Sequence, residues 1–145
     1  MTELEINKAM DVLLSVTVTG FGWRVAWPNC EFEPDDEPYV MVSFMPATTW
    51  TASLQNKGLI FRGVYQAMIV AKPGSGSQLL RQRAAEIAQV FESQMLPNGD
   101  TGVSGLRVNA EGDEVYLTGP ATIGAGFNTD YGYNVPISLN YRADS

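Results

Sequence analysis

The sequence contains no histidine, only one cysteine and few positive charges. Without histidine the chain has no imidazole base, no histidine-ligated metal and no Ser-His-Asp triad. The single cysteine, Cys30, excludes an internal disulfide and a cysteine-rich zinc site. Nine Lys and Arg residues stand against sixteen Asp and Glu residues, for a formal charge of −7. This acidic balance argues against a protein that binds nucleic acid by neutralising phosphates.

A basic leader and long apolar runs are missing as well. The segment Met1–Glu5 carries acids where a signal peptide would carry Lys or Arg. The longest apolar stretches span a handful of residues, far below the ~20 needed to cross a bilayer. The 145 residues are 45% hydrophobic and 10% aromatic, which suits one folded domain over residues 1–145. We therefore expect a soluble, intracellular single domain without a membrane segment.

Two segments have the spacing of amphipathic helices. The first begins after Thr2, which has capping-box spacing with Glu5, and its apolar pattern stops near Ser15, where β-branched residues follow. The second is expected at residues 78–95, with Ser77 as the N-cap and apolar residues three or four apart. Each helix should bury one face.

Strand patterns occupy much of the remaining chain. Five strands are predicted, at residues 39–45, 59–71, 105–109, 115–123 and 134–141. In the first, alternation directs Val40, Val42 and Phe44 towards the core. Gly63 interrupts the second strand and suggests a bulge or a close backbone approach. Pro136 removes a backbone donor from the last strand, which favours an edge strand or a bulge.

The order of these elements is α-β-β-α-β-β-β, and hairpins dominate over parallel crossovers. Such an order predicts an α+β fold in which a mostly antiparallel β-sheet carries two α-helices packed on one face.

An acidic loop is the first candidate functional segment. Residues 31–37 include five acids, and prolines interrupt the run, so a solvated loop is expected. The carboxylates of Asp35, Asp36 and Glu37 could also bind Mg²⁺ or Ca²⁺ through oxygen, although their spacing is not that of an EF-hand.

The polar segment 47–57 is the second candidate. It is longer than a tight hairpin needs, and it carries Trp50 and Leu54. Large apolar side chains in a polar loop either form a lid over the core or contact a partner. The sequence leaves these two alternatives open.

Catalytic signals are weak throughout. Residues 74–77 precede a helix, as in a phosphate-binding loop, but the Gly-Lys-Ser/Thr ending of a P-loop is missing. Paired carboxylates can perform acid–base chemistry, yet no acid here falls with a partner in a predicted cleft. We therefore expect no enzyme, no catalytic residue, no cofactor and no metal site, apart from a possible effect of divalent cations on assembly.

Several short motifs follow one another in a characteristic order along nearly the whole chain. They are a short N-terminal helix, Ala26–Asn29, a Phe32/Pro34 segment leading to Pro38 and Tyr39, Phe61–Gly63 before Gln66, Pro73–Gly76 before a helix, and the closing Val135–Arg142. This order resembles that of the tail-terminator proteins of long-tailed, lambda-like bacteriophages, a family that includes phage-related proteins of unknown function. No single motif is specific; the resemblance rests on the order, the length and the lack of catalytic residues.

The resemblance implies a structural virion protein of α+β fold. Such proteins form a hexameric ring that caps the tail tube, ends its polymerisation and presents the surface for head joining. The implied partners are further copies of the chain, the tail-tube protein and a head-completion or neck protein, with DNA only as passing cargo. The implied location is the head-proximal end of the virion tail, after assembly in the host bacterial cytoplasm.

For a ring-forming protein of this kind, six residues are candidates for assembly contacts. The predicted interface residues are Trp50, Leu54 and Arg62, and the predicted acidic rim or lumen consists of Asp35, Asp36 and Glu37. Two alternatives remain at this point: another ring protein of the head–tail neck, and a small enzyme that uses a carboxylate.

Overall fold

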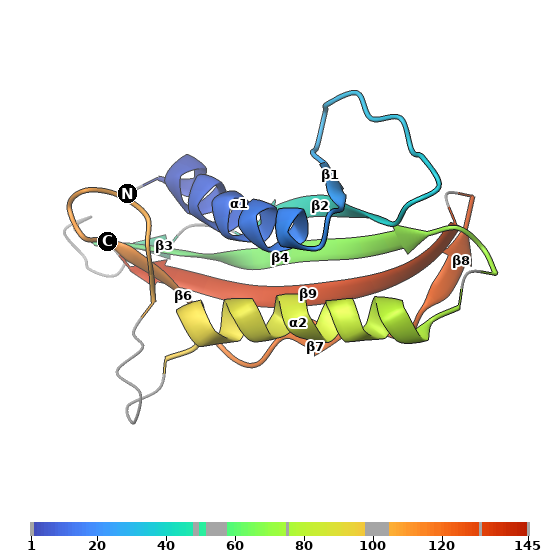
Figure 1. Ribbon diagram of the computed structural model, residues 1–145. Helices are drawn as coiled ribbons and strands as arrows, with labels where there is room; N and C mark the ends of the chain where they lie inside the picture. Colours follow the sequence, from blue (N-terminus) through green and yellow to red (C-terminus); the bar gives the residue numbers. More distant parts are fainter. Residues whose placement is uncertain are drawn as a thin grey trace.

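The computed structural model describes residues 2–47, 50–51, 58–74, 76–97, 105–130 and 132–144. In this part of the chain, two helices lie against one nine-stranded sheet, which confirms the α+β prediction (Figure 1). The elements in chain order are α1 (Glu3–Gly20), β1 (Arg24–Ala26), β2 (Tyr39–Pro46), β3 (Trp50–Thr51), β4 (Leu59–Ala71), α2 (Gln78–Met95), β5 (Leu106–Arg107), β6 (Glu114–Leu117), β7 (Thr122–Ile123), β8 (Phe127–Thr129) and β9 (Gly132–Asp144).

The two longest strands, β4 and β9, lie side by side in the middle of the sheet and pair antiparallel along almost their whole length. The strand order is β1-β2-β4-β9-β6-β5, with β3 beside β4 and with β7 and β8 beside β9. The pair β1–β2 is parallel, so the sheet is mixed rather than purely antiparallel. The strand predicted at 115–123 is divided into β6 and β7, and the short strands β1, β3 and β8 were not predicted.

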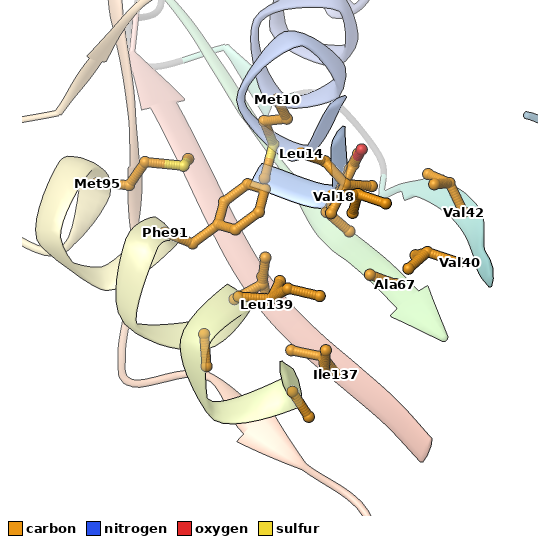
Figure 2. Packing of buried hydrophobic residues seen from close by; sticks show 14 of the residues in the cluster. Met10, Leu14, Val18, Val40, Val42, Ala67, Phe91, Met95, Ile137 and Leu139 are labelled. Atoms are coloured by element: carbon orange, nitrogen blue, oxygen red, sulfur yellow. The ribbon is translucent and has the colours of Figure 1, made fainter. Parts of the chain in front are cut away.

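The core lies between the helices and one face of the sheet. Figure 2 shows the side chains of both helices converging with those of three strands, namely Met10, Leu14 and Val18 of α1, Phe91 and Met95 of α2, Val40 and Val42 of β2, Ala67 of β4, and Ile137 and Leu139 of β9. The predicted alternation in β2 is confirmed, because Val40 and Val42 are buried and Phe44 is packed against the core.

Helix α1 extends beyond its predicted end near Ser15 and reaches Gly20. Its start is as predicted, since Thr2 and Glu5 form a reciprocal capping box. The added turn contains the β-branched Val18, whose side chain is fully buried. Thr17 is also accommodated, because its hydroxyl donates to the Leu13 carbonyl at 2.9 Å. Burial in the core outweighs the weak helix propensity of this turn.

Gly63 and Pro136 show how tightly the central strands fit. A Cβ on Gly63 would lie 2.5 Å from the Met45 carbonyl oxygen, which confirms the predicted close approach. Pro136 lies inside the sheet, so the edge-strand alternative is wrong. Its carbonyl accepts from Gly124 N–H at 2.9 Å. Because N–H and C=O of one strand residue point the same way, the missing donor faces the gap between β7 and β8.

Candidate assembly surfaces

The sheet face opposite the helices is one candidate contact surface. Both helices of the described chain lie on the other face (Figures 1 and 2). The strand register arranges the side chains of this open face in rows across β2, β4 and β9: Met41–Met68–Pro136, Ser43–Gln66–Ser138, Met45–Val64–Asn140 and, continuing onto β6, Arg62–Arg142–Tyr116. We refer to these residues as the open face.

Arg62, a predicted interface residue, is exposed at one end of the open face. Its cross-strand neighbour is Arg142, which forms an ion pair with Asp144 at 3.0 Å. Placing two guanidinium groups on adjacent strands costs repulsion unless acids lie nearby. Asp144 supplies one such acid at this end of the open face.

The other end of the open face is apolar. Met41, Met68 and Pro136 are half-buried there. The register of β8 with β9 adds Phe127 to the same face, and 42% of this residue is exposed. A groove of about 330 Å³ opens beside it, lined by aromatic, proline and methionine side chains that include Trp27, Phe32, Pro34, Tyr39 and Met41. Two rows separate this end from the arginine end, the polar row Ser43–Gln66–Ser138 and the mixed row Met45–Val64–Asn140.

Helix α1 carries a second uncovered surface. Its outer stripe consists of Leu4, Lys8, Val12 and Val16, and Leu4, Val12 and Val16 are 60%, 63% and 69% exposed. The outer face of α2 is more polar: apart from Leu79, which is 52% exposed, its exposed positions include Gln82, Ala85, Gln89 and Ser93. A surface helix normally presents polar residues to water, as α2 does. The outer stripe of α1 is therefore a candidate contact surface that the sequence interpretation missed, although the scarcity of charge after residue 8 is visible in the sequence.

The acidic loop is anchored by cations from outside it. The Arg24 guanidinium lies 4.5 Å from the Phe32 ring centroid, donates to the Glu33 carbonyl at 2.8 Å and pairs with Asp35 at 3.2 Å. Lys72 pairs with Asp36 at 2.8 Å and lowers the pKa of that carboxyl.

These contacts connect the predicted acidic rim to β1 and to the residue after β4. Asp35 Oδ1 also accepts from Glu37 N–H at 2.9 Å. Two of the three candidate acids are thus paired, which reduces the net charge that the loop presents. Sequence reasoning missed the pairing because Arg24 and Lys72 are distant from the loop's acids in the chain. The described residues include no group of three or more acids, cysteines or histidines arranged to hold a metal ion.

The other two predicted interface residues both lie in segment 47–57. Trp50 belongs to β3, whose register pairs it with Ile60 of β4. Leu54 lies outside the described residues. The interface role of both therefore stays a prediction.

A buried polar pair lies beneath α1. The Tyr65 hydroxyl, in a fully buried residue, donates to Asp11 Oδ1 at 2.6 Å. Burial raises the pKa of the Asp11 carboxyl, and the hydrogen bond from Tyr65 opposes that rise. Asp11 also lines a cavity of about 240 Å³ with Val12, Ser15 and Trp27. The only sequence signal for this site is one acid in an otherwise apolar half of a helix.

The glycine-rich segment before α2 borders a cavity of about 310 Å³ that Lys72 and Tyr133 help to line. Ser77 is the N-cap of α2 as predicted, but its side chain makes no capping hydrogen bond. No described helix is long and apolar enough to span a membrane.

Comparison with known proteins shows which family the chain resembles. A family model described as phage tail terminator protein matches residues 5–141. One solved structure is 27% identical in sequence, covers 99% of this chain and 96% of its own, and superposes with a TM-score of 0.75. A search of curated proteins finds no match.

Because the family model covers most of the chain, the protein belongs to the phage tail terminator family. It is therefore a structural component of a bacteriophage tail, in contact with other tail proteins, and its family indicates a protein that is not an enzyme.

Proposed function

We propose that this chain forms a ring that caps the phage tail tube, ends tube polymerisation and provides the surface for head joining. The observation that carries the proposal is the family match over residues 5–141. In this proposal the partners are further copies of the chain, six in a closed ring, the tail-tube protein and a head-completion protein. The ring lies at the head-proximal end of the tail, and DNA passes through it without a binding site.

The surfaces described above support a ring. Identical subunits close a ring through two different surfaces, each contacting its complement on the next copy. The open face and the outer stripe of α1 are two such surfaces, and both leave apolar side chains exposed. A single domain with one covered and one uncovered sheet face is suited to this kind of association.

The charge of −7 per chain suits a conduit for DNA. Phosphate binding relies on Lys and Arg, so an acidic bore repels passing DNA instead of holding it. The same charge opposes close approach of subunits. We therefore propose that assembly depends on protein concentration and is favoured by divalent cations, which screen or bridge carboxylates.

Electron microscopy of the purified protein mixed with tail-tube protein tests the proposal. The expected result is a ring at one end of each tube, with tubes that stop growing once capped. Light scattering across protein concentration, with and without Mg²⁺, measures the mass of the oligomer, and electron microscopy shows whether it is a ring.

Two outcomes contradict the proposal. A chain that is monomeric at every concentration and leaves tube length unchanged rules out the terminator role. A ring that binds head connectors but never tube ends identifies the alternative, another ring protein of the head–tail neck.

A further inference from the structure

We propose that the cavity between Asp11 and Trp27 binds an arginine side chain of another tail protein. This inference uses the contact with other tail proteins that the family implies, and it adds the place and the chemistry of one such contact. It does not depend on the proposed ring.

The cavity lies where α1 passes the end of β1 (Figure 1). Asp11 and Ser15 are one turn apart on α1, and Trp27 directly follows β1. Together with Val12, these residues line a space of about 240 Å³. A water molecule occupies roughly 30 Å³ in the liquid, so the space is large enough for a side chain.

The Asp11 carboxylate has room for a cation in this cavity. Its Oδ1 accepts from the Tyr65 hydroxyl, and among the described residues no donor to Oδ2 and no ion-pair partner of Asp11 is found. Burial raises the pKa of this carboxyl. The charged form has therefore lost part of its hydration, and a cation placed beside it would compensate for that loss.

Arginine held between an aromatic ring and a carboxylate is an arrangement that this chain uses elsewhere. The Arg24 guanidinium lies 4.5 Å from the Phe32 ring centroid and pairs with Asp35 at 3.2 Å. A planar guanidinium can stack on a ring while its N–H groups donate to a carboxylate. The ammonium group of lysine has no such plane, so an aromatic ring beside a carboxylate favours arginine.

A second example involves Arg83, which lies 4.5 Å from the Phe21 ring centroid and pairs with Glu86 at 2.8 Å. The cavity brings together the same two kinds of group, the indole of Trp27 and the carboxylate of Asp11. Here no arginine of the described residues completes the set. An arginine from outside the chain would do so.

The chain itself is a poor source of that arginine. Nine Lys and Arg residues stand against sixteen Asp and Glu residues. Three of the arginines, Arg24, Arg83 and Arg142, already pair with acids of the same chain. An acidic surface of this kind is complementary to a basic partner more than to a second copy of itself.

The aromatic groove described above extends the site. Trp27 lines both this groove of about 330 Å³ and the Asp11 cavity, and Phe32 and Pro34 line the groove further along. A partner segment with its arginine in the cavity can therefore place a neighbouring apolar side chain in the groove. The site thus fits a protein segment that carries arginine beside an apolar residue.

The first test uses two small probes. N-acetyl-arginine amide carries the guanidinium group, and N-acetyl-citrulline amide has nearly the same shape without the charge. Nuclear magnetic resonance of the isotopically labelled protein follows the indole N–H signal of Trp27 during titration. The arginine compound should shift this signal along a saturating curve, and the citrulline compound should leave it in place.

Two variants remove the site in different ways. Asp11→Asn removes the charge but keeps an acceptor for Tyr65, and Ser15→Arg supplies a guanidinium one turn from Asp11 on the same helix. Each should weaken binding of the arginine compound by roughly tenfold or more, because a charged hydrogen bond is lost or already occupied. Glu111→Gln and Gln89→Arg make the same charge changes at exposed positions elsewhere and should bind like the parent. Melting curves check that all four variants fold.

The second test measures assembly with and without the partner. Self-association of Asp11→Asn, followed by sedimentation velocity, should equal that of the parent. Co-sedimentation with phage tails assembled without this chain should require roughly tenfold more of Asp11→Asn than of the parent or of Glu111→Gln.

Three results overturn the proposal. If the citrulline compound shifts the Trp27 signal as the arginine compound does, or if Asp11→Asn binds like Glu111→Gln, the cavity is not an arginine site. If Asp11→Asn loses self-association, the arginine belongs to a second copy of the chain. If tails bind Asp11→Asn as tightly as the parent, the cavity is not the contact. The probe titration requires neither a ring nor a tube, so failure of the proposed function would leave its result unchanged.

Discussion

The Tyr65 hydroxyl and the Asp11 carboxylate are joined by a hydrogen bond of 2.6 Å, which connects β4 to α1 across 54 positions of the sequence. The tyrosine is fully buried and the aspartate is half-buried. Burial and the neighbouring carboxylate both raise the pKa of Tyr65, so the phenol stays protonated and remains a donor. The pair is a polar contact that fixes α1 over the sheet within an otherwise apolar interface.

Tyr65→Phe should destabilise the fold. The variant keeps the ring and its packing but leaves the Asp11 carboxyl without this donor. Loss of one partner from a buried hydrogen bond typically costs about 1–3 kcal/mol. Urea unfolding at neutral pH measures the change, and the double variant with Asp11→Asn shows how much of it belongs to the pair. An unfolding free energy equal to that of the parent would mean that water replaces the phenol.

Asp11→Asn should change the pH dependence of stability. Burial raises the folded-state pKa of Asp11 above 3.8, so the folded protein holds this proton more tightly than the unfolded chain does. The contribution of the Asp11 carboxyl to the free energy of unfolding is therefore present below pH 3.8, and it is lost as the pH rises through the folded-state pKa. Relative to the parent, the asparagine variant should gain stability as the pH rises over that window. Parallel curves of unfolding free energy against pH for the two proteins would contradict the expected shift.

The sequence predicts those parts of the fold that depend on local chemistry. The capping box of Thr2 and Glu5 and the N-cap position of Ser77 involve residues close together in the chain. The strand at 59–71 is found with the predicted bounds, because its apolar alternation is long and regular. The end of α1 was misplaced because the burial of Val18 depends on residues far away in sequence.

The candidate surfaces also divide into features that depend on neighbouring residues in the sequence and features that depend on distant ones. Arg62 was predicted as an interface residue; its exposure agrees with alternation in β4, where the preceding Phe61 is buried, and its role in an interface stays a prediction. Asp35 pairs with Arg24 of β1, and Asp36 pairs with Lys72, the residue after β4. No pattern of neighbouring residues in the sequence predicts either ion pair. The open face becomes visible only when both helices are known to lie on the other side of the sheet.

Gly63→Ala should lower stability by about 1–3 kcal/mol, the usual cost of forcing an extra methyl group into a packed site. The added Cβ would lie 2.5 Å from the Met45 carbonyl oxygen and 2.7 Å from the Tyr141 hydroxyl, so β2 or the tyrosine must shift. Gly20→Ala is the control, since nothing lies within 4 Å of its added Cβ. Thermal unfolding of both variants checks the prediction. Equal melting temperatures would show that β2 or Tyr141 shifts without a loss of stability.

Neutralising the acidic loop should affect assembly more than folding. The variant replaces Asp35 and Asp36 with Asn and Glu37 with Gln, which keeps the size of the side chains and removes three charges per subunit. The ion pairs to Arg24 and Lys72 are exposed, and such pairs contribute little to stability, so the melting curve should stay near that of the parent.

The expected change is in the salt dependence of ring formation or of head joining. Screening acts over roughly 8–10 Å at physiological salt, so the effect should be strongest at low ionic strength. Arg24→Gln is the companion variant, because it loosens the loop without removing an acid. If the triple variant assembles and joins heads like the parent at every salt concentration, the loop is only a connector.

Trp50→Ala should impair assembly and leave the fold intact. Trp50 is paired in register with Ile60 at the start of β4, in a strand of two residues. Tryptophan is the residue most enriched at interface hot spots, where truncation typically costs about 2 kcal/mol or more of binding free energy. Thr51→Ala, at the next position of the same strand, is the matched control for the backbone pairing. Melting curves and tail-length measurements in tube assembly reactions separate the two interpretations of this segment. A normal melting temperature with longer tubes supports a contact, a large fall in melting temperature supports a lid over the core, and normal values of both exclude a role for the indole.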